Sequence, residues 1–182
     1  MWMRGSFIVV LVGAMLIACV VPIQSAYDVE QPVPGTVLQV EFRSVDPISW
    51  APQEYRYTIS NACGIYDVPP EIVARLLWIE SRFNPKAVGG PNRDGTVDYG
   101  IAQINSAYLD DFKWRYKMPH LDPFNADDSI WFAVKHLRVL FEQTGNWWLA
   151  VASYNAGLNA VLSGNIPQSS AQYADYVIGI SS

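Results

Sequence analysis

The stretch that decides the fold is PPEIVARLLWIESRFNP, residues 69–85. Its two prolines and Glu71 suit the first turn of a helix, where proline loses no hydrogen bond and an acid meets the positive end of the dipole. Apolar residues then recur at helical spacing until Asn-Pro stops the helix. Glu80 comes four residues after Leu76 and three after Leu77, which places it on the apolar face of this helix.

A carboxyl group on an apolar face has a definite chemical consequence. Burial disfavours the charged form, so we expect a raised pKa for Glu80. A raised pKa is what a general acid working near neutral pH requires. The alternative is that Glu80, near the end of its helix, turns outward and pairs with Arg82 or Lys86. The position of the glutamate leaves both interpretations open.

Helical patterns continue on both sides of this stretch. They cover residues 54–62, 106–116, 127–143 and 147–156, and the 127–143 pattern ends at a glycine. Residues 89–95 are rich in glycine and polar residues and predict a loop, and a small β element is expected near 95–104. The sequence therefore predicts an α+β fold, predominantly α-helical, in one domain over residues 52–182.

Composition excludes several classes of function. The 182 residues are 51% hydrophobic and 16% charged, which provides for a real core and rules out wholesale disorder. The net charge of −5 argues against nucleic acid as the main partner. Cations and aromatics alternate over residues 113–117, a pattern of single-strand binding, of contacts to peptidoglycan carboxylates, or of a solvated helix face. Two cysteines and two histidines predict no metal centre, and His136 is expected on the surface.

The first 26 residues predict an export signal. A short positive start precedes an apolar run that is short for a membrane span. Residues 16–19, Leu-Ile-Ala-Cys, resemble a bacterial lipobox, so either lipidation at Cys19 or a plain cleaved signal is expected. Both place the domain in the periplasm or at the outer membrane, touching a membrane only through the signal or a lipid. Residues 27–51 are proline-rich and predict a linker, and no disulfide is expected for Cys63.

Four short motifs follow one another along the predicted domain. They are ESRFNP at 80–85, DYGIAQIN at 98–105, ASYNAG at 152–157 and YADYV at 173–177. This ordered set resembles the soluble lytic transglycosylases of the lysozyme-like superfamily, above all those associated with secretion and conjugation systems. The resemblance covers about residues 54–178.

The resemblance implies a lysozyme-like fold and an activity on peptidoglycan glycan strands. It implies cleavage of the β-1,4 bond between N-acetylmuramic acid and N-acetylglucosamine, without metal or cofactor. One carboxyl group protonates the leaving oxygen and then takes the proton from the C6 hydroxyl, which attacks C1 to form a 1,6-anhydro sugar. The expected residues are Glu80 as acid and base, Ser81 and Tyr154 in support, and Gln103, Asn105, Asn155 and Tyr176 on the substrate.

Asp98 is the main point at which the sequence departs from this picture. Gly-Ile-Ala-Gln at 100–103 replaces the family's usual Gly-Leu-Met-Gln, and the stretch around Asp98 also resembles that of animal-type lysozymes, which are hydrolases with two catalytic carboxyls. Asp98 is therefore a candidate second carboxylate; otherwise we expect it to accept hydrogen bonds from the turn at 92–96. Two alternatives stay open: a muramidase that uses Glu80 and Asp98, and a glycan-binding module without activity. A secretion or conjugation apparatus is the expected partner.

Overall fold

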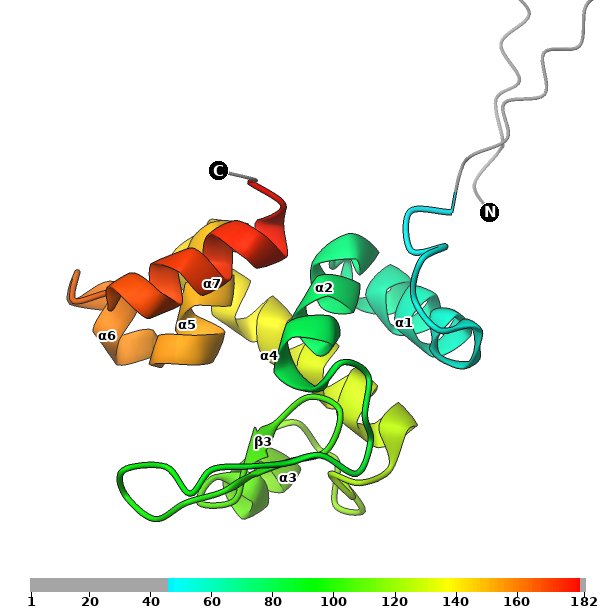
Figure 1. Ribbon diagram of the computed structural model, residues 1–182, viewed down its shortest axis with the longest axis horizontal. Helices are drawn as coiled ribbons and strands as arrows, with labels where there is room; N and C mark the ends of the chain where they lie inside the picture. The colour runs from blue at the N-terminus through cyan, green and yellow to red at the C-terminus, as the bar shows by residue number, and fades with distance from the viewer. Residues whose placement is uncertain (1–45, 181–182) are drawn as a thin grey trace, which may run out of the picture. The chain divides into compact units, whose positions relative to one another are not determined.

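A computed structural model of the chain describes residues 46–180. The predicted export signal, Cys19 and most of the predicted linker lie outside these residues. The described part is predominantly helical with one small sheet (Figure 1). Its elements are α1 (Gln53–Tyr66), α2 (Pro70–Ser81), β1 (Val88–Gly89), β2 (Asp98–Tyr99), β3 (Ile104–Asn105), α3 (Leu109–Arg115), α4 (Ala126–Thr144), α5 (Trp147–Ala156), α6 (Leu158–Leu162) and α7 (Gln168–Ile178).

Helix α2 begins at the predicted prolines but ends at Ser81, three residues before the Asn-Pro pair that was expected to stop it. Pro70 occupies its first turn, and five of the six residues from Ile72 to Leu77 are buried, the exception being Arg75. Arg82 ends it in the left-handed conformation with φ 54°, and Phe83 follows with φ 60°. Two left-handed residues in a row turn the chain sharply away from the helix axis. Glu80 therefore lies in the last turn, immediately before the chain reverses.

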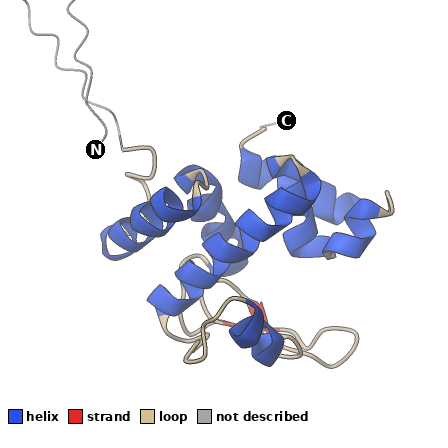
Figure 2. Cartoon of the chain, turned by 180° about the vertical axis from the view of Figure 1, so that it is seen from behind, coloured by secondary structure: helices blue, strands red, loops and turns tan. Residues whose placement is uncertain are grey.

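Helix α4 is the element around which the others pack. It runs through the middle of the described domain (Figure 2), in contact with α1 on one side and α5 on the other. Its buried residues include Ile130, Val134 and Leu137, which follow the helical period. Asparagine side chains cap both α4 and α5: Asn125 accepts from the backbone N–H of Asp128, and Asn146 from that of Leu149. Helix α7 then packs on α5 and α2.

The β element is a three-stranded antiparallel sheet of very short strands, in the order β1-β2-β3. Val88 pairs with Tyr99, and Asp98 pairs with Asn105. The strands near 98–105 confirm the predicted β element, whereas β1 begins at the edge of the segment predicted as a loop. Gly100 lies so close to Pro123 that no side chain fits between them.

Several features differ from the sequence-based expectation. Helices α6 and α7 were not predicted, and α1 extends four residues further than expected, to a left-handed Asp67. Ile48 and Ala51 are buried, so the packed domain includes residues before 52. Within residues 46–180, no helix combines the length and the hydropathy needed to cross a membrane.

Candidate active site

Glu80 is the centre of the candidate site. Its side chain is half-buried at the end of α2, and its Oε1 accepts a hydrogen bond of 2.5 Å from the hydroxyl of Tyr173 on α7. Burial raises the pKa of Glu80 to about 7. The Tyr173 hydroxyl acts in the opposite direction because it stabilises the anion, and the nearby negative charge of Asp98 adds to the rise. The sequence-based expectation of a raised pKa is confirmed, and Glu80 forms no ion pair with Arg82 or Lys86 in the described structure.

Tyr173 is the functional residue that sequence reasoning missed. It lies one helical turn before Tyr176, the tyrosine expected at the substrate. Tyr176 is half-exposed and lines a neighbouring pocket. The pKa of Tyr173 is held well above its usual range by burial and by the adjacent Glu80, so the hydroxyl keeps its proton and acts as a donor. The YADYV motif contains Tyr173, but the motif alone does not distinguish Tyr173 from Tyr176.

Tyr154 also lies near Glu80, but its hydroxyl has another partner. It donates to the backbone carbonyl of Ala102 at 2.8 Å, which ties α5 to the segment between β2 and β3. Burial, followed by the charge of Glu80, raises the pKa of Tyr154 well above its usual range. Tyr154 therefore fixes one wall of the site, and the direct bond to the Glu80 carboxyl comes from Tyr173.

Ser81 holds the other side of Glu80. Its hydroxyl donates to the carbonyl of Ile101 at 2.8 Å, a contact between the end of α2 and the β2–β3 segment. A weaker contact of 3.3 Å reaches the carbonyl of Leu77 within the helix. Ser81 thus positions the backbone beside Glu80 rather than the reacting groups.

Asp98 is held in a network of amides. Its Oδ1 accepts from Asn105 at 2.8 Å and its Oδ2 accepts from Asn92 at 3.0 Å. Asn105 also donates to Thr96 at 2.9 Å, so one amide joins β3 to the turn. The expected bond from the 92–96 turn is therefore present, with Asn105 as a second donor. Both oxygens of Asp98 are engaged in fixing the loop.

The remaining predicted site residues are distributed around this centre. Gln103 has φ 48°, and its amide donates to the carbonyl of Gly100 at 2.8 Å while its oxygen lies against Gly89. Asn155 accepts from Ser170 at 2.7 Å, a contact between α5 and α7. The structure therefore gathers Glu80, Ser81, Tyr154 and Asp98 around one place, and gives Asn155 a role in joining two helices.

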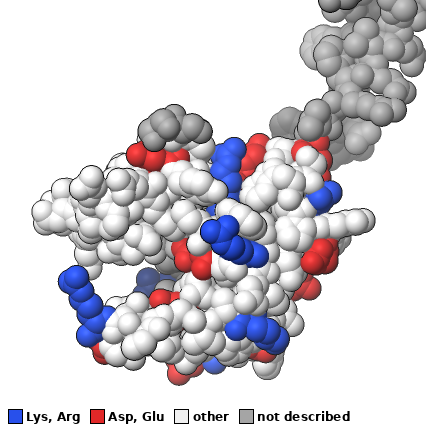
Figure 3. Space-filling view, in the orientation of Figure 1, with Lys and Arg blue, Asp and Glu red and all other residues white. Residues whose placement is uncertain are grey.

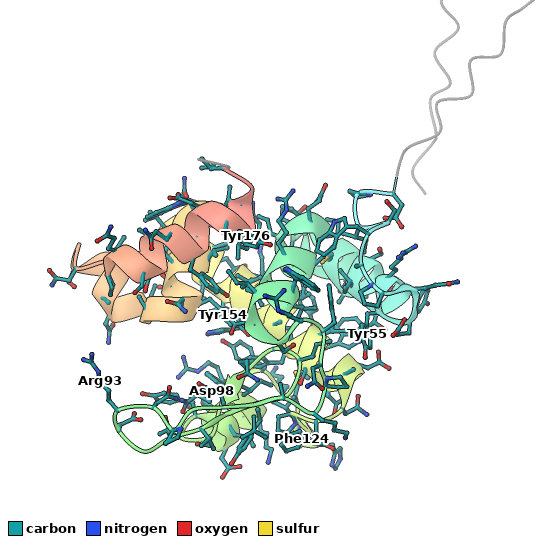
Figure 4. The ribbon with its side chains drawn as sticks, viewed as in Figure 1. Tyr55, Arg93, Asp98, Phe124, Tyr154 and Tyr176 are labelled. Atoms are coloured by element: carbon teal, nitrogen blue, oxygen red, sulfur yellow. The ribbon has the colours of Figure 1, made fainter. Side chains whose placement is uncertain are left out.

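The surface is hollowed between the helices α5–α7 and the loop that carries Arg93 (Figure 3). Figure 4 shows Tyr154 on the helical side of this hollow and Asp98 on the sheet side, with Arg93 at the outer tip of the loop. An extended polymer can lie across such an open depression. In residues 46–180, no cluster of three His, Cys, Asp or Glu side chains could hold a metal ion.

His136 lies behind this site, contrary to the expected surface position. Its Nδ1 is 2.6 Å from the hydroxyl of Tyr116, and its ring packs against Phe132 and Tyr154. Burial lowers the pKa of His136 to about 4, so the ring is neutral near pH 7. The error arose because its neighbours Lys135 and Arg138 suggested a polar face, whereas rings from other parts of the chain, those of Phe112, Tyr116 and Tyr154, enclose His136 together with Phe132 of its own helix.

The comparison with known families decides the assignment. The description "Transglycosylase SLT domain" matches residues 58–176, well over half of the chain. The chain belongs to the SLT transglycosylase family. The match includes Glu80 and Tyr173 and covers the first three motifs in full and the fourth up to Tyr176.

Named relatives of this SLT domain come from enteric bacteria. Protein IpgF of Shigella flexneri is 35% identical over 95 residues, which cover 50% of this chain and 60% of that protein. Invasion protein IagB of Salmonella typhimurium is 31% identical over 96 residues, which cover 51% of this chain and 58% of that protein. The aligned region thus spans somewhat more than half the length of each relative.

Solved structures agree with the fold of this SLT domain. The 70 kDa soluble lytic transglycosylase of Escherichia coli aligns with a TM-score of 0.60 at 20% identity, covering 68% of this chain and 23% of that one. An inactive mutant of the lytic transglycosylase Slt of Pseudomonas aeruginosa aligns with a TM-score of 0.57 at 18% identity. The alignment covers 70% of this chain and 23% of that one. The lysozyme-like fold is therefore confirmed.

Proposed function

We propose that this chain is a peptidoglycan lytic transglycosylase in which Glu80 acts as the single general acid and base. The observation that carries the proposal is the state of Glu80: half-buried, with a pKa raised to about 7 and its carboxyl bonded by Tyr173. A large fraction of Glu80 is then protonated near neutral pH, and the group is also basic enough to take a proton back.

The proposed reaction needs no second carboxyl group. Glu80 gives its proton to the glycosidic oxygen, the C1–O bond breaks, and the sugar carries positive charge at C1 that the substrate's N-acetyl group supports. Glu80, now an anion, removes the proton of the C6 hydroxyl, and O6 bonds to C1. Glu80 ends protonated as it began, and water is not consumed. Tyr173 steadies the carboxylate between the two proton transfers.

A hydrolase is the second candidate, and one observation favours it. Asp98 is close enough to Glu80 for its negative charge to raise the Glu80 pKa. Against it, both Asp98 oxygens already accept hydrogen bonds from Asn92 and Asn105. A carboxylate occupied in this way supports a loop more readily than it supports a developing charge at C1.

The products separate the two candidates. Mass analysis of muropeptides released from purified sacculi should find 1,6-anhydromuramic acid ends with the wild-type chain. Glu80→Gln, which keeps the shape but cannot donate the proton, should abolish release, whereas Asp98→Asn should lose less than tenfold, about 1.4 kcal/mol. Reducing ends from the wild type would establish the hydrolase. Glycan binding without release by the wild type would establish the binding module.

We also propose an extracytoplasmic place of action. Peptidoglycan lies outside the cytoplasm, and the predicted export signal at 1–26 is consistent with that location. The Salmonella relative is named an invasion protein. The resemblance of the four motifs to secretion-associated members of the family supports a role beside a secretion apparatus. We expect the chain to open the wall locally for such an assembly, with lipidation at Cys19 or plain export bringing it there.

A further inference from the structure

A second depression lies where α2 and α7 approach each other. Its volume is about 950 Å³. Figure 4 shows Tyr176 on α7 at this place, and Figure 3 shows basic side chains over α2. We call this depression the α2–α7 pocket. It is lined by Trp50, Pro52, Arg75, Trp78, Arg82, Phe83, Gln172, Asp175, Tyr176, Gly179 and Ile180.

Helical spacing creates the two long walls of the α2–α7 pocket. Arg75 and Trp78 are three residues apart and share one face of α2. Arg82 follows the end of the helix and extends this wall, because its guanidinium lies over the Trp78 ring. Gln172 and Tyr176 form the matching stripe on α7 with the same period. These walls combine aromatic faces with guanidinium groups.

The aromatic faces of the pocket are accessible. Trp50 keeps 49% and Tyr176 keeps 50% of its surface exposed. Trp50 also packs against Phe83, with ring centroids 6.0 Å apart, so the aromatic wall is ordered rather than a single loose ring. Such a wall accepts apolar and peptide groups of a ligand.

Arg82 is the available cation of the pocket. Its guanidinium lies 4.7 Å from the centre of the Trp78 ring, and among residues 46–180 it has no carboxylate partner. Lys113 and Arg115 differ, because each pairs with an aspartate on α3. These pairs favour a solvated helix face for the charged residues of the 113–117 stretch, one of the three interpretations its sequence allowed, whereas Tyr116 within it is buried.

The other charged residues of the pocket are already engaged. Arg75 donates to the carbonyl of Ile178 at 3.1 Å and caps the end of α7. Asp175 accepts from the indole N–H of Trp148 at 2.7 Å. Arg82 therefore remains as the group that can meet an anion from outside. A guanidinium stacked on an indole is weakly hydrated and binds a carboxylate with two parallel hydrogen bonds.

The position of the pocket identifies the ligand. Gln172 and Tyr176 flank Tyr173 on α7, so the pocket lies within about one helical turn of the Glu80–Tyr173 pair. The peptide stem is the part of the glycan strand that extends away from the sugar under attack. We propose that the α2–α7 pocket binds the peptide stem of the glycan strand and that Arg82 pairs with a stem carboxylate. This inference rests on the proposed function and makes Arg82 a specificity-determining residue.

The test compares two substrates that differ in the stem. One is a soluble uncrosslinked glycan strand with its peptides, and the other is the same strand after an amidase has removed them, leaving free lactyl carboxylates. The full chain, Arg82→Gln and the control Arg115→Gln are assayed for kcat/KM on both. We expect the wild type to prefer the peptide-bearing strand, and Arg82→Gln to lose about tenfold on that strand alone, the effect of one charge-assisted hydrogen bond. Arg115→Gln should match the wild type.

Gln172→Glu provides a second variant. It brings a negative charge to the pocket without altering the conformation of residue 82, and should cause the same selective loss. Equal losses on both strands, or a wild type that prefers the stripped strand, would overturn the inference.

A binding measurement keeps this test independent of catalysis. The free stem pentapeptide is titrated into each full-length variant by calorimetry, with a peptide whose carboxyl groups are amidated as the control ligand. We expect the dissociation constant of the pentapeptide to rise about tenfold in Arg82→Gln. Unchanged binding in that variant would refute the pocket's role. If no variant cleaved either strand, the proposed function would fail, and the titration would still decide the pocket.

Discussion

At the scale of single residues, Glu80 carries two opposing influences. Burial and the charge of Asp98 favour its protonated form, and the Tyr173 hydroxyl favours the anion. The balance leaves the pKa at about 7, close to the pH at which a group used as both acid and base is most effective. Tyr173 therefore tunes the group as well as orienting it.

The first prediction concerns Tyr173→Phe. Removing the hydroxyl removes the one influence that lowers the Glu80 pKa, so the pKa should rise above 7. The acid stays protonated to higher pH, and the alkaline limb of kcat/KM should move up by about one pH unit. The maximal rate should fall about tenfold, because the carboxylate is a less well oriented base. The pH profile of strand cleavage measures both effects.

Tyr154→Phe is the matched control for this prediction. Its hydroxyl bonds to Ala102 and not to Glu80, so the alkaline limb should stay in place even if the rate falls. A limb that moves equally in both variants would mean that general repacking, rather than the bond to Glu80, sets the pKa.

Sequence reasoning could find Glu80 but not its partner. The apolar neighbours of Glu80 lie on its own helix, so the helical period alone predicts its burial. Tyr173 and Tyr176 lie on adjacent turns of α7, and nothing local distinguishes the one that faces α2. That choice depends on how two helices far apart in sequence pack together, which periodicity does not encode. His136 was misjudged for the same reason.

At the scale of elements, the end of α2 is joined to both neighbouring parts of the domain. Ser81 bonds to Ile101 in the β2–β3 segment, and Glu80 is bonded by α7. Gly100 stands next to Ile101 and packs against the backbone at Pro123. The position of the acid therefore depends on a close backbone approach that only glycine permits.

The second prediction tests this approach with Gly100→Ala. A β-carbon there would lie 1.6 Å from the Pro123 carbonyl oxygen, and the residue has φ 72°. The backbone must move to relieve this contact. We therefore expect the unfolding free energy to fall by at least about 3 kcal/mol in total, which exceeds the usual 1–2 kcal/mol for a left-handed alanine. Urea denaturation followed by circular dichroism gives the value.

Gly95→Ala is the control, because Gly95 has φ 83° but no atom within 4 Å of the added carbon. It should show only the conformational cost of about 1–2 kcal/mol. Similar losses of unfolding free energy in the two variants would show that the backbone at Pro123 moves at little energetic cost.

A helix was predictable where apolar residues at the helical period and the residues typical of helix ends indicate the same segment. Residues 127–143 have apolar positions at the helical period and a glycine at the end, and α4 differs from the prediction by one residue at each end. The buried stripe of helix α7 follows the helical period but consists of small or weakly apolar residues, Ser170, Ala174 and Val177, so its sequence signal is weaker. The helix is stabilised by packing on α2 and α5, which becomes visible only in the assembled domain.

At the scale of the whole molecule, the ionisation of Glu80 makes the stability of the folded state depend on pH. Glu80 has a folded pKa of about 7 against an ordinary value of 4.5. Between these values the folded chain holds more protons than the unfolded chain, so stability falls as pH rises through this range. The loss of stability caused by the buried Glu80 carboxylate is constant well above pH 7, and it disappears below about pH 4.5.

The third prediction follows for Glu80→Gln. The amide needs no proton, so the variant should be more stable than the wild type by about 1–3 kcal/mol at pH 8 and equal to it near pH 4. Thermal unfolding across this pH range tests the expectation. A stability difference that is independent of pH would show that packing, and not ionisation, distinguishes the two side chains.

Arg82 has a wider consequence for engineering this protein. It ends α2 at φ 54°, a conformation that costs a residue with a β-carbon about 1–2 kcal/mol and that glycine adopts freely. A search for heat resistance alone would favour glycine at this position. The same change would delete the cation stacked on Trp78. Thermostability and substrate choice therefore compete at one residue. Variants selected only for a higher melting temperature should lose the preference for peptide-bearing strands.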